Sequence, residues 1–249
     1  MLINENYLTW LKELGGYYEC RMVDGHHFDP LVGYAGRYEG LRGDEQYVGR
    51  IYVNFAVVEE SPLLLNEVAQ DILSLGIPLA GVSGFCGAPE GGKALAVLLG
   101  LHSGLCYIFP EEKVTQVATK TSRKISEFFF GRHRPKAGEV WWIVEDVCNN
   151  FSTTARLIAL IESYGAKVGG IICFLNRSLE VDETFVSSSG DSFPVVALVR
   201  KPFGQFRQDD PAVQGDISSG NVVWKPKDEW QRLEESQKRE ITILFPKDD

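Results

Sequence analysis

The chain has 249 residues, of which 44% are hydrophobic and 24% are charged, enough for one sizeable globular core. Its 25 basic and 34 acidic residues give a net charge of −9, which argues against general binding to nucleic acids or anionic membranes. No apolar run is long enough to span a bilayer, and the first five residues lack a signal-peptide pattern. We therefore expect a cytoplasmic protein that binds neither nucleic acid nor membrane, although a local basic site for phosphates remains compatible with this charge.

The first sixty residues contain a helix and then a glycine-rich stretch. Apolar side chains at helical spacing predict an amphipathic helix over residues 3–15. The segment from about 16 to 57 is rich in Gly, Tyr and Arg, and we expect a strand over 47–55. Ser61 and Pro62 predict the start of a helix that ends near Leu75, because Ser favours the N-cap and Pro the first turn.

The middle of the chain alternates between apolar strands and helices. This alternation predicts an α/β fold with a mostly parallel central sheet flanked by helices on both faces. Ligands of such sheets bind at the carboxyl ends of the strands. The expected strands lie near residues 78–86, 105–109, 140–144, 168–175 and 193–199, and the expected helices at 93–101 and 155–164.

Two segments interrupt this alternation. Residues 113–138, here called the basic segment, carry many Lys and Arg side chains around three consecutive phenylalanines, and either a mobile lid or a solvated surface hairpin would explain them. Residues 201–249, here called the tail, contain an expected helix near 227–239 and an apolar stretch at 241–245. We expect one main domain over residues 1–200, with the tail packing on its core or on a partner subunit.

Five cysteines are scattered along the chain, and no close pair has metal-ligand spacing. Most of them lie in apolar contexts that resemble strands. They therefore indicate buried free thiols in a reducing compartment rather than disulfides. The five are Cys20, Cys86, Cys106, Cys148 and Cys173.

The strand near 140–144 delivers two adjacent carboxylates, Glu145 and Asp146, here called the acidic pair. Residues 149–154, here called the phosphate segment, follow with amides and hydroxyls, and a helix comes next. Unpaired backbone N–H groups and the helix dipole converge at such a helix N-terminus and favour anions. Neighbouring carboxylates can bind sugar hydroxyls or Mg²⁺. The stretch therefore suits a sugar phosphate.

A glycine-rich sequence at residues 87–93, here called the glycine turn, follows an earlier strand. Its spacing matches that of a Walker A loop, and the strand of the acidic pair could serve as Walker B. However, Ala94 stands where that motif has the hydroxyl that holds magnesium. A glycine-rich turn without a ligand is a second alternative. We favour a loop that cradles a pyrophosphate.

With these motifs the chain resembles the type I phosphoribosyltransferases, over about residues 30–200. An apolar strand, two acids and a loop of hydroxyl residues resemble that family's phosphoribosyl-diphosphate motif, and the glycine turn resembles its pyrophosphate loop. Within the family the orotate phosphoribosyltransferases are the most similar. They have a strand-rich N-terminal segment over the base, here matched by residues 16–57 (the hood, with Arg37 and residues 47–54), a basic flexible loop, and an Arg after the following strand, here Arg177 after Asn176.

The resemblance implies a site for 5-phosphoribosyl 1-diphosphate, Mg²⁺ and a nitrogenous base, with orotate favoured, in a homodimer. Glu145 and Asp146 would hold the ribose hydroxyls, directly or through Mg²⁺, and Val147 would also belong to the donor site. The phosphate segment would bind the 5-phosphate through Asn149, Asn150, Ser152, Thr153 and Thr154. Pro89, Glu90, Gly91, Gly92 and Lys93 would bind pyrophosphate, and Arg50 and Arg177 the base. The implied catalytic residues are Lys124, Arg132, His133 and Asp146.

The phosphate segment departs from the family pattern. Asn149, Asn150 and Phe151 replace the usual threonines and glycines. Asn tolerates a left-handed backbone, whereas Phe does so poorly, so we expect the Phe151 side chain to point into the core instead. Either the segment is rebuilt for the same ligand, or the protein senses nucleotides or diphosphates without catalysis. Transfer to a base other than orotate is a further alternative.

Overall fold

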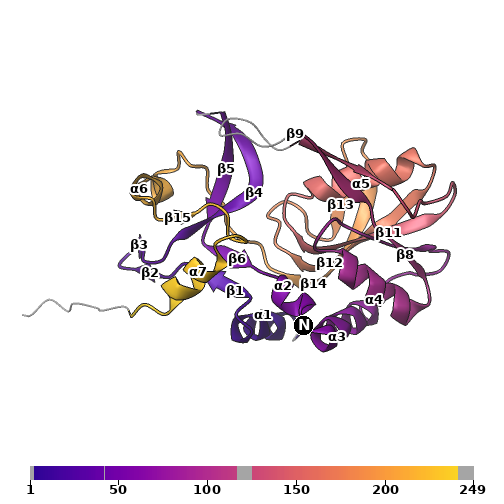
Figure 1. The fold of residues 1–249 in the computed structure, drawn as a ribbon, viewed down its shortest axis with the longest axis horizontal. Coiled ribbons are helices and arrows are strands. Elements are labelled where there is room, and N and C mark those ends of the chain that lie inside the picture. Colours follow the sequence, from indigo (N-terminus) through magenta and orange to yellow (C-terminus); the bar gives the residue numbers. More distant parts are fainter. Residues whose placement is uncertain (1–2, 42, 117–124, 241–249) are drawn as a thin grey trace, which may run out of the picture. The chain divides into compact units, whose positions relative to one another are not determined.

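The computed structural model describes residues 3–41, 43–116 and 125–240 (Figure 1). Contacts divide the chain into two compact units: Met1–Gly16 with Phe55–Phe203, and Tyr17–Asn54 with Gly204–Asp249. The dividing points differ from those expected from sequence. The hood and the tail belong to the same unit, instead of a domain over 1–200 followed by an extension.

The first unit contains a six-stranded sheet of order β13-β14-β12-β11-β7-β8. The five strands from β14 to β8 pair in parallel, and β13 pairs antiparallel with β14 at one edge. The predicted mostly parallel α/β sheet is thus confirmed. The strands are β7 (Gly84–Gly87), β8 (Cys106–Ile108), β11 (Val140–Cys148), β12 (Lys167–Asn176), β13 (Thr184–Val186) and β14 (Ser192–Arg200).

Helices cover both faces of this sheet. The crossover from β7 to β8 through α4 (Lys93–Ser103) runs in the opposite lateral direction to the crossover from β11 to β12 through α5 (Ser152–Ser163). Right-handed crossovers in opposite directions place their helices on opposite faces. The helices α1 (Ile3–Glu13) and α3 (Pro62–Ser74), with the short α2 (Ala56–Glu59), lie on the α4 side, as Figure 1 shows.

Most expected boundaries hold within two or three residues, but three differ in ways that affect the site. β11 continues to Cys148, so the acidic pair lies inside the strand rather than after it. α5 begins at Ser152, so the last three residues of the phosphate segment form the first helical turn. β7 begins only at Gly84, because the chain before it forms a turn, and β13 was not anticipated.

Residues 113–116 and 125–129 of the basic segment belong to an antiparallel ribbon of β9 (Glu111–Gln116) and β10 (Ile125–Phe129), and residues 130–138 follow it outside any strand or helix. Side chains at its base pack on α5. The Phe128 ring lies 3.6 Å from the guanidinium carbon of Arg156, and the buried Phe130 ring meets Tyr164 with ring centroids 5.6 Å apart. The expected hairpin is therefore confirmed for β9 and β10. The end of this ribbon nearest α5 packs on the first unit.

The second unit has its own core around β4 (Leu31–Gly40), which pairs antiparallel with β5 (Gly43–Gly49) and parallel with β15 (Val222–Val223). The single strand expected over 47–55 is broken at Arg50, because β6 (Ile51–Val53) leaves β5 and pairs with β1 (Tyr17–Glu19) instead. The unit also contains β2 (Met22–Val23), β3 (His26–His27), α6 (Pro211–Ser219) and α7 (Trp230–Gln237).

Tail side chains complete that second core. Val213, Val222, Val223 and Leu233 are buried in one cluster with hood residues that include Leu31 and Val48. The buried Asp29 side chain accepts hydrogen bonds from Arg21 of the hood and Gln237 of the tail. The tail is therefore an integral part of this unit. The apolar stretch expected at 241–245 lies outside the described residues.

All five cysteines are free, and four of them are buried, as expected. Only Cys106, on the edge strand β8, is exposed. Among the described residues, no helix combines the length and hydropathy needed to cross a membrane.

Candidate functional site

The strand order places the topological switch point of the sheet between β7 and β11. After β7 the chain turns outward to β8, and after β11 it turns the other way to β12. Two connections that diverge from neighbouring strands leave a crevice outside the carboxyl ends of those strands, where ligands of open α/β sheets bind. The glycine turn leaves β7 and the phosphate segment leaves β11 at this edge. The structure thus brings together two motifs that are about sixty residues apart in sequence.

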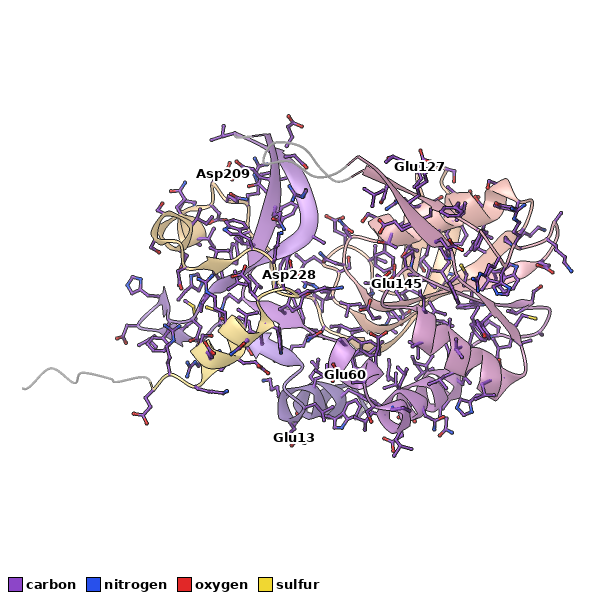
Figure 2. The ribbon with its side chains drawn as sticks, in the orientation of Figure 1. Glu13, Glu60, Glu127, Glu145, Asp209 and Asp228 are labelled. Atoms are coloured by element: carbon purple, nitrogen blue, oxygen red, sulfur yellow. The ribbon has the colours of Figure 1, made fainter. Side chains whose placement is uncertain are left out.

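The acidic pair occupies the last part of β11. Glu145 is 8% exposed and lies within the first unit, where Figure 2 labels it, while Asp146 is half-buried. The backbone N–H of Val147 donates to Asp146 Oδ1 at 2.7 Å, which fixes the orientation of that carboxylate. Burial, and then the charge of Glu145, raise the pKa of the Cys86 thiol on β7. Cys86 is therefore a neutral neighbour of the pair and not a nucleophile.

The glycine turn packs directly against the acidic strand. Ala88 N–H donates to the Val144 carbonyl at 2.8 Å. A Cβ added to Gly92 would lie 1.9 Å from that same carbonyl oxygen, and one added to Gly91 would lie 2.3 Å from the carboxyl carbon of Asp146. Glycine is required at position 92, where the obstacle is backbone, while a side chain at position 91 would have to displace the carboxylate of Asp146. This close approach places the turn beside the carboxylate of Asp146.

Charged groups border the glycine turn. Glu90 has a left-handed backbone with φ of 73°, and its exposed carboxylate lies 3.5 Å from Lys93 Nζ at the start of α4. A pair exposed to this degree contributes little to stability, so Lys93 can exchange its partner for a ligand at small cost. Lys93 Nζ also lies 5.6 Å from the centre of the Phe109 ring, and Pro89 is half-buried.

The phosphate segment begins with a residue in an unusual conformation. Phe151 is the N-cap of α5 and has φ of 55° and ψ of 19°, in the left-handed region. The expectation that Phe would avoid this region is wrong, while the expectation that its side chain points into the core is confirmed, because Phe151 is 3% exposed. Its ring stacks on Phe185 with centroids 5.2 Å apart and planes 13° apart. Burial of the ring offsets the backbone strain.

Polar groups of the segment differ in their access to solvent. Asn150 is exposed and its Oδ1 accepts the N–H of Ser152 at 3.2 Å, while Asn149 is half-buried. Ser152 is exposed and Thr153 half-buried, in the first helical turn. Thr154 is 1% exposed, so its hydroxyl is buried rather than directed outward. The helix N-terminus with Ser152 and Thr153 is therefore the accessible anion-binding part.

The candidate basic residues have different surroundings. Lys124 lies outside the described residues. Arg132 and His133 are exposed and follow β10, and the His133 ring meets Phe109 edge-on with centroids 6.5 Å apart. Phe109 thus lies beside both His133 and Lys93. The sequence analysis did not single out Phe109, although an aromatic residue at the end of an apolar strand was a usable signal.

Arg177 is buried directly after β12, with 5% exposure, so it is not a surface arginine. Its backbone N–H donates to the Cys148 carbonyl at 2.9 Å, and its guanidinium carbon lies 5.3 Å from the centre of the Phe203 ring. The side-chain amide of Asn176 donates to the carbonyls of Val181 and Asp182 and so holds the loop after β12. Nothing in the sequence indicated this role.

Arg50 belongs to the second unit. Its guanidinium donates from Nε and Nη2 to the Cys20 carbonyl, at 3.3 and 3.1 Å. Arg50 lies at the break between β5 and β6.

Comparison with solved structures finds chains of similar fold. The chain is similar to UMP synthase from Leishmania donovani, with 13% identity and a TM-score of 0.51, and the match covers 93% of this chain and 41% of that one. It is also similar to orotate phosphoribosyltransferase from Aeropyrum pernix, with 17% identity and a TM-score of 0.48, and this match covers 78% of this chain and 92% of that one. The match to adenine phosphoribosyltransferase from Rhodothermus marinus has 14% identity and a TM-score of 0.48, and it covers 79% of this chain and 99% of that one.

The chain has the fold of the type I phosphoribosyltransferases. At these identities the structural likeness establishes the fold and leaves the activity to be argued from the site. No protein-family model matches the sequence, and a search of curated proteins likewise finds no match.

Proposed function

We propose that this protein binds 5-phosphoribosyl 1-diphosphate and transfers its phosphoribosyl group to a nitrogenous base, with release of pyrophosphate. One observation carries the proposal: the acidic pair and the glycine turn meet at the carboxyl ends of neighbouring strands, with Gly91 packed against Asp146. An anion-binding helix N-terminus begins a few residues later. A pyrophosphate site, a ribose site and a phosphate site would then follow one another along a single crevice.

Each part has a role in that chemistry. The Glu145 and Asp146 carboxylates would accept hydrogen bonds from the ribose hydroxyls, and the phosphate segment would bind the 5-phosphate. The N–H groups of the glycine turn and Lys93 would neutralise the pyrophosphate as it leaves the anomeric carbon. The sugar then carries positive charge, as in other glycosyl transfers, so catalysis relies on positioning and electrostatics.

The carboxylates of the site suit Mg²⁺ held jointly with the substrate. Within the described residues, no group of three or more His, Cys, Asp or Glu side chains could form a metal site of its own. Mg²⁺ commonly takes one or two carboxylates, several waters and the phosphate oxygens of a substrate. Glu145 and Asp146 fit that pattern, and the ion would neutralise pyrophosphate charge when bound.

We favour orotate as the base because Arg177 is buried at the end of β12, beside Phe203. A planar guanidinium is suited to a carboxylate such as that of orotate, which adenine lacks. Lys124, Arg132 and His133 act on the pyrophosphate during transfer, and the protein works in the cytoplasm as a homodimer.

The test is a turnover assay on the purified chain with 5-phosphoribosyl 1-diphosphate, Mg²⁺, and either orotate or adenine. We expect orotate to be consumed with stoichiometric release of pyrophosphate, and omission of Mg²⁺ to stop the reaction. Asp146→Asn should lower kcat/KM by at least about a hundredfold, since it removes a charge that stabilises the transition state. Its melting temperature should change little, because Asp146 lies half-exposed at the crevice.

Adenine consumption in place of orotate would overturn the base assignment and keep the transferase. No turnover with any common base would overturn the transferase assignment. Loss of folding in Asp146→Asn would mark that residue as structural instead.

A second candidate is a binding protein that senses a nucleotide or diphosphate without turnover. The observation that favours it is the phosphate segment, where Phe151 holds the left-handed position. This candidate predicts binding of the donor without pyrophosphate release, and a Phe151→Gly variant that binds but remains inactive. Calorimetry on the same samples that enter the turnover assay separates the two candidates.

A further inference from the structure

The stacked pair of Phe151 and Phe185 joins the start of α5 to the edge strand β13. Phe151 begins α5 after β11, whereas Phe185 lies on β13, in the segment that follows β12. The rings are nearly parallel, with an interplanar angle of 13° and a centroid distance of 5.2 Å. Phe151 is buried, and Phe185 is partly buried against the same core cluster.

A backbone hydrogen bond fixes the point where the phosphate segment begins. Arg177 N–H, directly after β12, donates at 2.9 Å to the carbonyl of Cys148, the last residue of β11. The chain is therefore held at two points: by this bond directly before the phosphate segment, and by the aromatic stack at Phe151 within it.

The backbone conformation of Phe151 depends on this stack. A non-glycine residue with φ of 55° is strained, and such a conformation persists only where the surroundings hold it. The ring of Phe151 is held by the core and by Phe185, and the backbone of Phe151 directs the N–H groups of the first turn of α5. A glycine could adopt the same φ without strain, but it would also allow the segment to adopt other backbone conformations.

We infer that Phe151 and Phe185 form a positioning pair that fixes the N-terminus of α5 for the 5-phosphate of the donor. This inference rests on the proposed function. In place of a glycine loop that closes around the phosphate, the chain has a preorganised segment anchored by a ring on the edge strand β13. Preorganisation lowers the ordering cost of binding, so the pair acts on affinity for the phosphate and not on pyrophosphate.

The experiment is calorimetry with two probes that address different ends of the crevice: ribose 5-phosphate for the α5 N-terminus, and Mg²⁺-pyrophosphate for the glycine turn. Phe185→Leu removes the stack but keeps an apolar side chain at a partly buried position. We expect this variant to bind ribose 5-phosphate about three- to tenfold more weakly than the unmodified protein, and to keep its affinity for pyrophosphate within about twofold. Phe185→Tyr, which keeps the ring, should restore the original affinity.

Tyr164→Leu is the matched control. Tyr164 caps the other end of α5, is also partly buried, and pairs with Phe130 at 5.6 Å. This variant should lose comparable thermal stability without losing affinity for either probe. In the turnover assay, Phe185→Leu should raise KM for the donor and leave kcat nearly unchanged.

The outcomes separate the two proposals. If the unmodified protein binds neither probe, the proposed function fails and this inference fails with it. If the unmodified protein binds ribose 5-phosphate and Phe185→Leu binds it equally well, only the positioning role is overturned. Equal weakening by Tyr164→Leu, or equal weakening of both probes, would also overturn it, since the effect would then be general destabilisation.

Discussion

The left-handed backbone of Phe151 predicts an inverted order of stability between alanine and glycine. Phe151 is 3% exposed, and truncation of a buried Phe to Ala costs about 3–5 kcal/mol. Alanine keeps the left-handed strain of about 1–2 kcal/mol, whereas glycine is free of it. We therefore expect Phe151→Ala to lose about 4 kcal/mol of unfolding free energy and Phe151→Gly about 3 kcal/mol.

Phe130 is the control for this comparison. It is 1% exposed, belongs to the same core cluster, and has no positive φ. At Phe130, glycine should be less stable than alanine by about 0.5–1 kcal/mol, the usual cost of glycine flexibility.

Urea denaturation of the four variants and the unmodified protein measures both differences. In thermal melting, a difference of about 1 kcal/mol corresponds to about 2–4 °C for a chain of this size. If Phe151→Gly is no more stable than Phe151→Ala, the left-handed assignment is refuted. If Phe130→Gly is also more stable than Phe130→Ala, the inverted order of stability does not come from the backbone of Phe151.

Three further predictions concern other residues. Gly91→Ala would place a Cβ 2.3 Å from the carboxyl carbon of Asp146 and displace that carboxylate, so calorimetry should show an affinity for the donor at least about tenfold weaker. The control is Gly215→Ala, which should bind the donor normally because a Cβ there meets nothing within 4 Å. Unchanged affinity in Gly91→Ala would contradict the packing of the turn on β11. Burial opposes ionisation of the Asp29 carboxyl, but hydrogen bonds from Arg21 more than offset this effect and lower the pKa of Asp29 in the folded protein. The ion pair therefore stabilises the fold fully above the unfolded pKa of about 3.9, and this stabilisation is lost as the pH falls through the lower folded pKa. Asp29→Asn should lose about 3 kcal/mol at pH 7 in urea titrations and decline less steeply below pH 4, and an equally steep decline would exclude this ion pair as the cause. Ellman's reagent should label one thiol of the native protein, at Cys106, and five after denaturation, because the others are buried and burial raises the pKa of Cys20 to about 12. Labelling that persists in a Cys106→Ser variant would show a second accessible thiol.

The regular elements of the first unit were readable from sequence because their signals are local. Apolar periodicity located β11, β12 and β14, and Ser61 with Pro62 marked the start of α3 at Pro62. The order of strand, acids, polar segment and helix also depends only on neighbouring residues. The acidic pair, the glycine turn and the phosphate segment were therefore identified as candidates from the sequence.

Boundaries within the candidate site were not readable in the same way. Sequence ended the strand before Glu145, but pairing with β12 continues β11 to Cys148, since strand length depends on the neighbouring strand. Propensity excluded Phe from a left-handed position, whereas packing on Phe185 holds Phe151 there. In both cases a non-local contact outweighed a local preference.

The sequence by itself determined which residues could bind a sugar phosphate, because residue type and spacing set that chemistry. Only the tertiary structure decided that the glycine turn lies against Asp146, that Arg177 is buried, and that the tail completes the core of the hood. These facts follow from strand order and from contacts between residues far apart in the chain. Periodicity carries no information about such contacts, because it records which face of an element is buried and not what covers that face.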